Sequence, residues 1–223
     1  MAARRKIDVR ELLRPERALR AEGFCWIAGV DEAGRGPLAG PVVAAAVVLP
    51  PERDDLPAVF DSKQLSAAAR EDVFAELHAL EGIQIGVASA SPAEIDALNI
   101  LRATHLAMRR AVAELRRADF VLVDGLPVRF DLPSRNMVGG DAKCACIAAA
   151  SIVAKVTRDR EMIRAAERFP QYGFAEHKGY GTAEHLAMLK KYGPSELHRK
   201  SFRPVRELLP DFPVQGTLDL QEK

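Results

Sequence analysis

Short apolar runs alternate with longer amphipathic stretches along most of this chain, which is the pattern of an α/β fold. Runs with the length and composition of buried strands lie at 25–30, 41–49, 83–88 and 120–125. Stretches with the periodicity or the end signals of helices lie at 66–80, 99–117, 147–168 and 183–192. The segment Ser91–Glu94 has the composition of a capping box and predicts a further helix start. We therefore expect a mixed sheet flanked by helices.

Changes in composition divide the chain into four parts. Residues 1–22 are charged, and their few leucines predict a short surface helix outside the core, so we treat them as an N-terminal extension. Residues 23–168 hold the predicted sheet and its helices. Residues 169–212 mix aromatic, glycine and basic residues, which predicts a small helical C-terminal subdomain suited to nucleic acid. Residues 213–223 have no core-forming pattern, so we expect a disordered tail.

The overall composition narrows the class of protein. With 223 residues and a net charge of +1, the chain fits one large domain and would bind nucleic acid through local basic patches. No apolar stretch reaches about 18 residues, so we predict no membrane span, no signal peptide and a cytoplasmic location. The cysteines Cys25, Cys144 and Cys146 predict buried free thiols rather than disulfides or a tetrahedral zinc site. Nothing in the sequence requires a dimer, and we expect a monomer.

Carboxylates follow two of the predicted strands and one further short apolar segment. Asp31 and Glu32 come directly after the first run, Asp124 ends the fourth, and Asp141 follows residues 137–140. Carboxylates at the end of a buried strand are costly to desolvate unless a cation neutralises them, and Mg²⁺ prefers such oxygen ligands. Asp31 and Asp124 are the first-ranked ligands, because adjacent strands would place them side by side. The alternative is that these acids are turn residues.

The loop after the first two acids adds a second signal. Gly34, Arg35 and Gly36 form a turn whose backbone N–H groups can approach an anion closely, so acids and loop together predict a metal-assisted phosphate site. A salt-bridged hairpin turn is the alternative explanation. Because neighbouring side chains on a strand point to opposite faces, Asp31 and Glu32 can share one site only if the strand ends or bends there.

Seven short motifs, in a fixed order, resemble those of bacterial ribonuclease HII. They are residues 31–37 (DEAGRGP), 61–66 (DSKQLS), 123–125 (VDG), 140–141 (GD), 148–156 (AAASIVAKV), 177–182 (HKGYGT) and 198–202 (HRKSF). The resemblance covers about residues 26–206. It implies a ribonuclease H-like mixed sheet with a small helical C-terminal subdomain. It also implies an endonuclease that uses Mg²⁺ or Mn²⁺ to cleave RNA–DNA hybrids and single ribonucleotides embedded in duplex DNA, leaving 3′-hydroxyl and 5′-phosphate ends.

The same resemblance implies roles for particular residues. The family's metal-binding acids correspond to Asp31, Glu32, Asp124 and Asp141. The residues implied to bind the substrate are Gly34, Arg35, Gly36 and Tyr180. We also predict that Lys63, Arg199 and Ser201 bind the substrate, although Lys63 could instead pair with Asp61. The glycine–arginine–glycine loop and the tyrosine would recognise the step from ribose to deoxyribose, which only the 2′-hydroxyl distinguishes. The family often has lysine where this chain has Gly139, so a cation near the fourth acid is missing.

Other interpretations stay open at this point. The chain could be another nuclease of the same fold, such as ribonuclease HIII, although only about 25 residues precede the first strand and the extra N-terminal domain of that family is missing. An actin-like ATPase or a non-catalytic clamp-associated nucleic-acid binder are further alternatives. Residues 215–220 (QGTLDL) resemble the short peptide with which bacterial replication proteins bind the sliding clamp, which makes the clamp a candidate partner.

Overall fold

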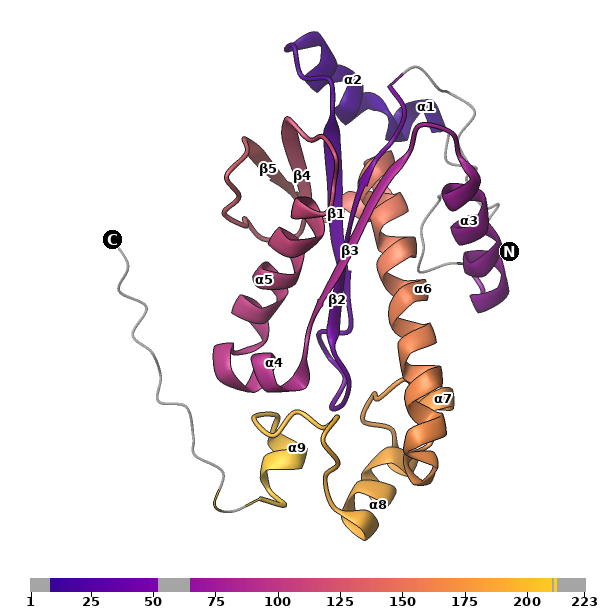
Figure 1. Cartoon of the computed structure of the whole chain (residues 1–223), viewed down its shortest axis with the longest axis vertical. Helices are drawn as coiled ribbons and strands as arrows, with labels where there is room; N and C mark the ends of the chain where they lie inside the picture. Colours follow the sequence, from indigo (N-terminus) through magenta and orange to yellow (C-terminus); the bar gives the residue numbers. More distant parts are fainter. Residues whose placement is uncertain (1–8, 52–64, 210, 212–223) are drawn as a thin grey trace, which may run out of the picture.

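The computed structural model describes residues 9–51, 65–209 and 211, and these residues form a mixed sheet of five strands (Figure 1). The strands are β1 (Ile27–Ala33), β2 (Val42–Val48), β3 (Gln84–Ala90), β4 (Phe120–Asp124) and β5 (Ser134–Met137). Their order across the sheet is β3-β2-β1-β4-β5. Pairing is antiparallel from β3 to β1 and parallel from β1 to β5. The predicted mixed sheet is confirmed.

Helices cover both faces of this sheet. In chain order they are α1 (Val9–Leu12), α2 (Arg14–Ala21), α3 (Ala67–Ala79), α4 (Pro92–Leu98), α5 (Ile100–Ala113), the 3₁₀ turn η1 (Gly140–Ala142), α6 (Ala145–Arg168), the 3₁₀ turn η2 (Pro170–Tyr172), α7 (Phe174–His177), α8 (Ala183–Tyr192) and α9 (Arg203–Arg206). Helices α3 and α6 pack on one face of the sheet, and α4 and α5 lie on the other (Figure 1). Each face therefore has its own hydrophobic cluster.

The observed elements differ from the predicted ones in a few places. β1 starts at Ile27 and runs on to Ala33, beyond its predicted end at residue 30. The apolar pattern does not predict β5, because Ser134–Met137 is a mostly exposed edge strand of largely polar residues. The capping box at Ser91 is confirmed, since its hydroxyl accepts a hydrogen bond from the backbone N–H of Glu94 while the Glu94 carboxylate accepts one from the N–H of Ser91.

Helix α6 lies directly against β1, because the residues between them are small. A Cβ atom on Gly29 would lie 2.2 Å from the backbone carbonyl carbon of Cys146, so only glycine permits this approach. Ala148, Ala149 and Ala150 continue the contact and are completely buried. This packing fixes the beginning of α6 relative to the acidic end of β1.

The N-terminal helices contribute to the hydrophobic core. Leu12, Leu13 and Leu19 are at most 3% exposed and belong to the same cluster as residues of β2 and α6. Glu16 is also buried, and its Oε1 accepts a hydrogen bond from the backbone N–H of Cys146 at 2.8 Å. The expectation of a surface helix outside the core was therefore wrong. These three leucines pack inward despite the charged composition of the segment.

The cysteines and the helices test two further predictions. Cys144 and Cys146 are buried and free, as predicted, but Cys25 is exposed, so the prediction of a buried thiol was wrong for Cys25. The backbone N–H of Cys25 donates to a carboxylate oxygen of Asp119 at 2.8 Å just before β1 begins, where the chain is still at the surface. Within the described ranges, no helix is both long enough and apolar enough to cross a membrane.

The segment after α6 is helical and has an aromatic core of its own. The rings of His177 and His185 stack at 4.4 Å, and Tyr172 stacks on Phe174 at 5.3 Å. His198 Nε2 lies 3.1 Å from Nε2 of His185. Burial, and next the neighbouring His185, lower the pKa of His198 to about 4, so this ring is neutral at pH 7. These histidines pack the segment together.

Candidate active site

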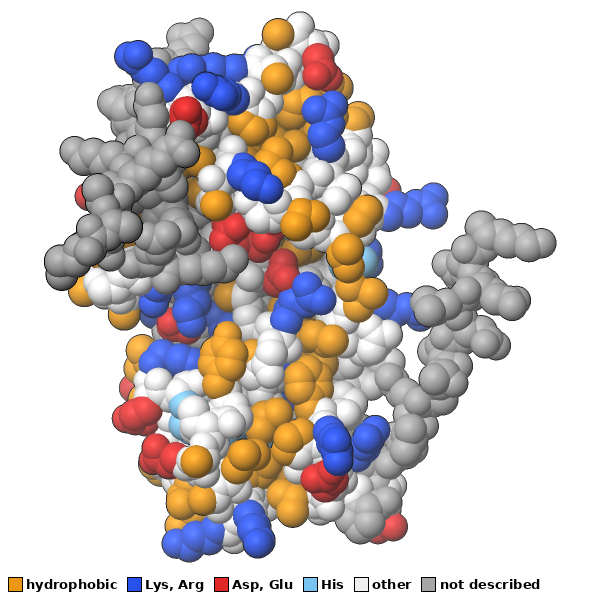
Figure 2. All heavy atoms as spheres, turned by 180° about the vertical axis from the view of Figure 1, so that it is seen from behind, with side chains coloured by type: hydrophobic (Ala, Val, Ile, Leu, Met, Phe, Trp, Pro, Cys, Tyr) orange, Lys and Arg blue, Asp and Glu red, His pale blue; other side chains and the backbone are white. Residues whose placement is uncertain are grey.

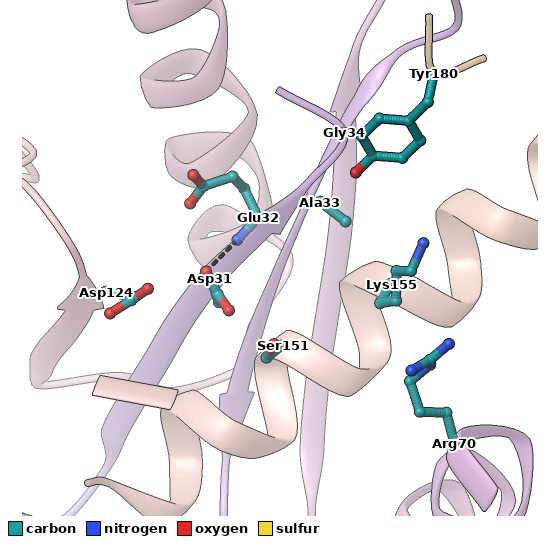
Figure 3. A pocket seen from close by; sticks show the side chains of 9 residues that line it. All are labelled: Asp31, Glu32, Ala33, Gly34, Arg70, Asp124, Ser151, Lys155 and Tyr180. Atoms are coloured by element: carbon teal, nitrogen blue, oxygen red, sulfur yellow. Dashed lines mark hydrogen bonds between the residues drawn. The ribbon is translucent and has the colours of Figure 1, made fainter. Parts of the chain in front are cut away.

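The carboxyl ends of β1 and β4 lie side by side, which brings the two first-ranked acids together (Figure 3). The parallel register pairs Val30 with Val123, so Asp31 and Asp124 are the next residues along the two strands. Both line one pocket of about 350 Å³, together with Glu32. The strand-end acids therefore meet where the sequence predicts that they meet.

Asp31 and Glu32 line this pocket together, although β1 neither ends nor breaks between them. The strand continues through both residues to Ala33 and stays paired with β2 over that length. On its other side, pairing with β4 stops at Val30. Beyond that point the β4 side of β1 is open, so the pocket reaches both faces of the strand. Figure 3 shows the two side chains leaving β1 in different directions around this opening.

The pocket concentrates negative charge in a partly desolvated place. Asp31 is only 6% exposed. Burial, and next the charges of Glu32 and Asp124, hold the pKa of the Asp31 carboxyl well above its usual range. Burial also raises the pKa of Glu32, although the guanidinium of Arg35, 3.1 Å away, opposes this effect. Desolvated carboxylates that repel one another are a suitable set of oxygen donors for a hard divalent cation.

This repulsion leads to a prediction about stability without metal. The raised pKa of Asp31 means that its buried charge destabilises the folded state near neutral pH and that stability increases as the pH falls through this pKa. We expect Asp31→Asn to raise the melting temperature in EDTA at pH 7.5 by a few degrees, since 1 kcal/mol corresponds to roughly 2–4 °C for a chain of this size. The amide oxygen can still accept the hydrogen bond from the N–H of Glu32.

Thermal melts of the metal-free protein between pH 4 and pH 8 measure this effect. The gain should shrink toward low pH, where the wild-type carboxyl takes up its proton. Asp131→Asn is the matched control, because Asp131 is an exposed acid that does not line the pocket. A D31N variant less stable than wild type at pH 7.5 would contradict the charge repulsion inferred for this site.

Asp141 reaches the same end of the sheet on the short turn η1. It is 3% exposed and follows Gly140, whose backbone N–H donates to Oδ1 of Asp124 at 2.7 Å. The described residues that line the acidic pocket do not include Asp141. The ammonium of Lys143 lies 3.8 Å from the position of a Cβ built on Gly139, where the family often has lysine. Lys143 therefore places an ammonium group beside Gly139, two residues before the fourth acid in the sequence.

Cationic side chains face the acids across the pocket. Lys155 on α6 and Arg70 on α3 line it, together with Ser151 one helical turn before Lys155 (Figure 3). On the molecular surface, acidic side chains gather near the middle of one face, with lysine and arginine side chains around them (Figure 2). The sequence prediction did not include these three residues. The spacing of Ser151 and Lys155, which places them on one helical face, was the available signal.

The glycine–arginine–glycine loop lies against the loop that carries Tyr180. Gly34 has φ of +94°, a conformation that favours glycine. A Cβ on Gly36 would be 3.7 Å from the ring of Tyr180, so this ring lies over the loop. Tyr180 is 46% exposed and lines the acidic pocket. The two predicted recognition elements are thus neighbours at the edge of one pocket.

Arg158 and Arg199 lie buried beneath these two loops. Arg199 donates to the carbonyl oxygens of Arg35 at 2.8 Å and Gly40 at 3.0 Å, and also to those of Gly34 and Pro41. Arg158 donates to the carbonyls of Ala39, Pro41 and Lys178. Burial, and next the charge of Arg158, lower the pKa of Arg199 to about 9, so it stays charged at pH 7. Arg199 is 0% exposed, so it supports the loop from below and presents no surface to a substrate.

Ser201, another predicted substrate residue, is not part of the pocket lining. The hydroxyl of Ser201 donates to Oδ1 of Asp96 at 2.7 Å, which ties the segment after His198 to α4. Lys63 lies outside the described residues. Of the predicted substrate residues in the described ranges, Gly34 and Tyr180 line the acidic pocket itself.

The fold and this acidic pocket place the chain among the nucleases of the ribonuclease H-like class. Two solved structures share the fold. The ribonuclease H2 from Pyrococcus horikoshii OT3 has a TM-score of 0.68 and 28% identity, with 82% of this chain and 96% of that chain covered. The structure of the PCNA:RNase HII complex from Archaeoglobus fulgidus contains a chain with a TM-score of 0.67 and 29% identity, with 86% and 98% covered.

Sequence comparison narrows this class to one family. The family model described as Ribonuclease HII matches residues 28–205. Ribonuclease HII of Geobacillus thermodenitrificans is 54% identical over 93% of this chain and 79% of its own length. Ribonuclease HII of Syntrophotalea carbinolica is 54% identical over 87% of this chain and 93% of its own length. The chain belongs to the ribonuclease HII family, and it is a hydrolase with ribonuclease H activity on RNA–DNA hybrids. The predicted family and fold are confirmed.

Proposed function

We propose that this ribonuclease HII cleaves both continuous RNA in hybrids and single ribonucleotides embedded in duplex DNA. The cut falls on the 5′ side of the ribonucleotide and leaves 3′-hydroxyl and 5′-phosphate ends. The observation that supports this proposal is the contact of the Gly34–Gly36 loop with Tyr180 at the rim of the acidic pocket. All these parts come from one chain, so we also propose that the enzyme acts as a monomer.

Asp31, Glu32, Asp124 and Asp141 would hold divalent cations, and we propose Mg²⁺ or Mn²⁺. The donors fit such ions, because three of these acids line one pocket and burial raises the pKa of Asp31 and Glu32. When bound, a pair of such ions would activate water and stabilise the leaving oxygen in an in-line displacement. Lys155 and Arg70, on the opposite wall, would neutralise the phosphate groups of the cleaved strand.

The chain's own residues would select the sugar. Backbone groups of the glycine loop can approach the 2′-hydroxyl closely, because Gly36 carries no side chain beside Tyr180. The ring of Tyr180 would stack on the next sugar and leave no room for another 2′-hydroxyl, which selects deoxyribose by exclusion. Hydrogen bonds from Arg199 to the carbonyls of Gly34 and Arg35 hold the loop in place for this contact.

A duplex with one ribonucleotide tests the proposal. In Mg²⁺ or Mn²⁺ we expect a single cut on the 5′ side of that ribonucleotide, mapped by the length and end groups of the products. Tyr180→Ala should reduce cleavage at the single ribonucleotide by roughly tenfold or more, since a base- or sugar-stacking contact is worth about 1–3 kcal/mol. Tyr192→Ala is the matched control, because Tyr192 is equally exposed and does not line the pocket. Equal losses for Tyr180→Ala on long hybrids and single ribonucleotides would exclude the junction role.

We further propose that residues 215–220 bind the sliding clamp. These residues lie outside the described ranges, and the proposal rests on their sequence pattern of a glutamine followed by two leucines. An archaeal relative of the same fold has been solved as a complex with PCNA. Deletion of residues 214–223 should abolish capture by the immobilised clamp while cleavage of a short hybrid stays within twofold of wild type. Clamp capture that survives this deletion would refute the assignment.

A further inference from the structure

A buried cluster at the beginning of α6 consists of Glu16, Cys144 and Cys146. Along the chain, the turn η1 lies between Asp124 and the two cysteines. Glu16 comes from α2, and the two cysteines flank the first residue of α6. One carboxylate oxygen and both sulfur atoms lie within 4.8 Å of one another. Among the described residues, this is the one set of three histidine, cysteine or acidic side chains that converges so closely. In Figure 1, α2 lies near the end of the sheet where α6 begins.

One carboxylate oxygen of Glu16 has no hydrogen-bond partner in the protein. Oε1 of Glu16 accepts the backbone N–H of Cys146, whereas Oε2 is buried and has no hydrogen-bond partner. A buried carboxylate oxygen without a partner costs roughly 1–3 kcal/mol or more, so sites of this kind are rare unless something occupies them. The Glu16 side chain is 1% exposed, which leaves water no access to that oxygen from the surface.

We propose that Glu16, Cys144 and Cys146 bind one thiophilic divalent cation of the Zn²⁺ type, in a site distinct from the catalytic acids. Cysteine thiolates and carboxylate oxygens are both zinc ligands in proteins, whereas the catalytic acids offer oxygen alone. The third ligand comes from a residue 130 positions away in the sequence. This is why the cysteine spacing by itself predicts no zinc site.

The sulfur geometry fits a bridging cation better than a disulfide. The two sulfur atoms are 3.4 Å apart, which is the distance of a hydrogen bond between the two thiols. Tetrahedral zinc with bonds of about 2.3 Å would place them about 3.8 Å apart, while a disulfide needs about 2.0 Å. The N–H groups at the start of α6 add a positive potential that favours the extra negative charge of the ligands. Binding would release the thiol and carboxyl protons to solvent, as it does in other thiolate sites.

Occupancy of this site would connect α2 to the catalytic end of the sheet. Leu19 of α2 belongs to the same buried cluster as the two cysteines, and Glu16 is 1% exposed, so the cation can enter only when α2 separates from α6. The backbone N–H of Cys144 donates to the carbonyl of Gly140 at 2.8 Å, and the N–H of Gly140 in turn donates to Asp124. A cation bound here would stabilise the docked α2 and the turn that carries Asp141.

Cobalt titration of the metal-free full-length protein tests the proposal. Co²⁺ is a spectroscopic substitute for Zn²⁺, and thiolate ligation gives a near-ultraviolet charge-transfer band that oxygen ligands do not. We expect this band to saturate at one equivalent and to disappear when Zn²⁺ is added. Cys25→Ser should leave it unchanged, because Cys25 is exposed and does not belong to the cluster. The double variant Cys144→Ser/Cys146→Ser should lose it. A wild-type protein without the band, or a double variant that keeps it, overturns the proposal.

Thermal melts distinguish a metal-ligand role of Glu16 from a purely structural role as a cap of α6. Glu16→Gln keeps an oxygen that can accept the N–H of Cys146 but removes the anionic ligand. If Glu16 binds the cation, Zn²⁺ should raise the melting temperature of wild type clearly more than that of E16Q. If Glu16 only caps α6, the variant and wild type should differ by the same amount with and without Zn²⁺, and that result also overturns the proposal. These readouts do not depend on cleavage activity.

Discussion

Asp124→Asn should nearly abolish cleavage while the protein stays folded and still binds an RNA–DNA hybrid. Asp124 ends β4 beside Asp31 and lines the acidic pocket. Loss of an outer-shell partner of a metal ligand already costs about 10–100-fold, so loss of a ligand itself should exceed a hundredfold. In the wild type, the backbone N–H of Gly140 donates to Oδ1 of Asp124 at 2.7 Å. Folding should survive, because the amide oxygen of asparagine can still accept this hydrogen bond. Single-turnover cleavage and a gel-shift assay measure the two effects separately.

The control for this experiment is an exposed aspartate away from the pocket. Asp131→Asn removes the same charge from a different part of the surface, so the rate should stay within twofold of wild type. If D124N cleaves at the wild-type rate, Asp124 holds no catalytic cation and the acidic pocket is not the active site. If D124N neither folds nor binds, melting and gel-shift data will reveal this before the rate is interpreted.

The sequence predicted the sheet and its acids well for a physical reason. Buried strands need continuous apolar runs, so an acid that follows such a run, as Asp31 and Asp124 do, is visible without coordinates. The same logic misses β5, which is an exposed edge strand with no apolar pattern. It also misplaces the N-terminal helices, because their burial depends on Leu12, Leu13 and Leu19, and the average charge of the segment conceals these few apolar positions.

The problem of two adjacent acids in one pocket could not be solved from the sequence. Alternation along a strand predicts that Asp31 and Glu32 point apart, and in the structure they do. They line one pocket because β4 stops pairing with β1 at Val30 and leaves that edge open. Such an opening is a property of two strands that are some 90 residues apart in the sequence, so no local pattern contains it. The same holds for Arg70, which reaches the pocket from α3.

Long-range packing also decides what Arg199 does. Its place in a basic, motif-rich segment predicts contact with the substrate, but its guanidinium is buried and bound to backbone carbonyls of the glycine loop. The loop comes more than 150 residues earlier in the chain, which explains why the sequence alone could not separate the two roles. Arg158 also packs against this loop from a distant part of the sequence. A Cβ atom on Gly34 would lie 1.9 Å from Nε of Arg158 and would overlap its side chain.

Arg199→Met should therefore destabilise the protein strongly. Its guanidinium donates to the carbonyls of Gly34, Arg35, Gly40 and Pro41. Each buried carbonyl that loses its hydrogen-bond donor destabilises the folded protein by roughly 1 kcal/mol. We therefore expect the free energy of unfolding to fall by about 3 kcal/mol or more. For a chain of this size, that corresponds to a melting temperature lower by roughly 6–12 °C. Denaturant titration and thermal melts provide the measurement, and Arg199→Lys should fall between wild type and Arg199→Met, because one ammonium group satisfies fewer carbonyls.

Arg203→Met is the matched control, because Arg203 follows in the same segment but is 82% exposed in its pair with Glu207. The free energy of unfolding of this variant should differ from that of wild type by no more than about 0.5 kcal/mol.

Cleavage distinguishes support of the recognition loop by Arg199 from a general effect on stability. At a temperature where R199M is still folded, it should discriminate single ribonucleotides from plain DNA less well than wild type, because the loop that contacts Tyr180 has lost its anchor. Wild-type discrimination in a folded but destabilised R199M would mean that Arg199 stabilises the fold without positioning the recognition loop.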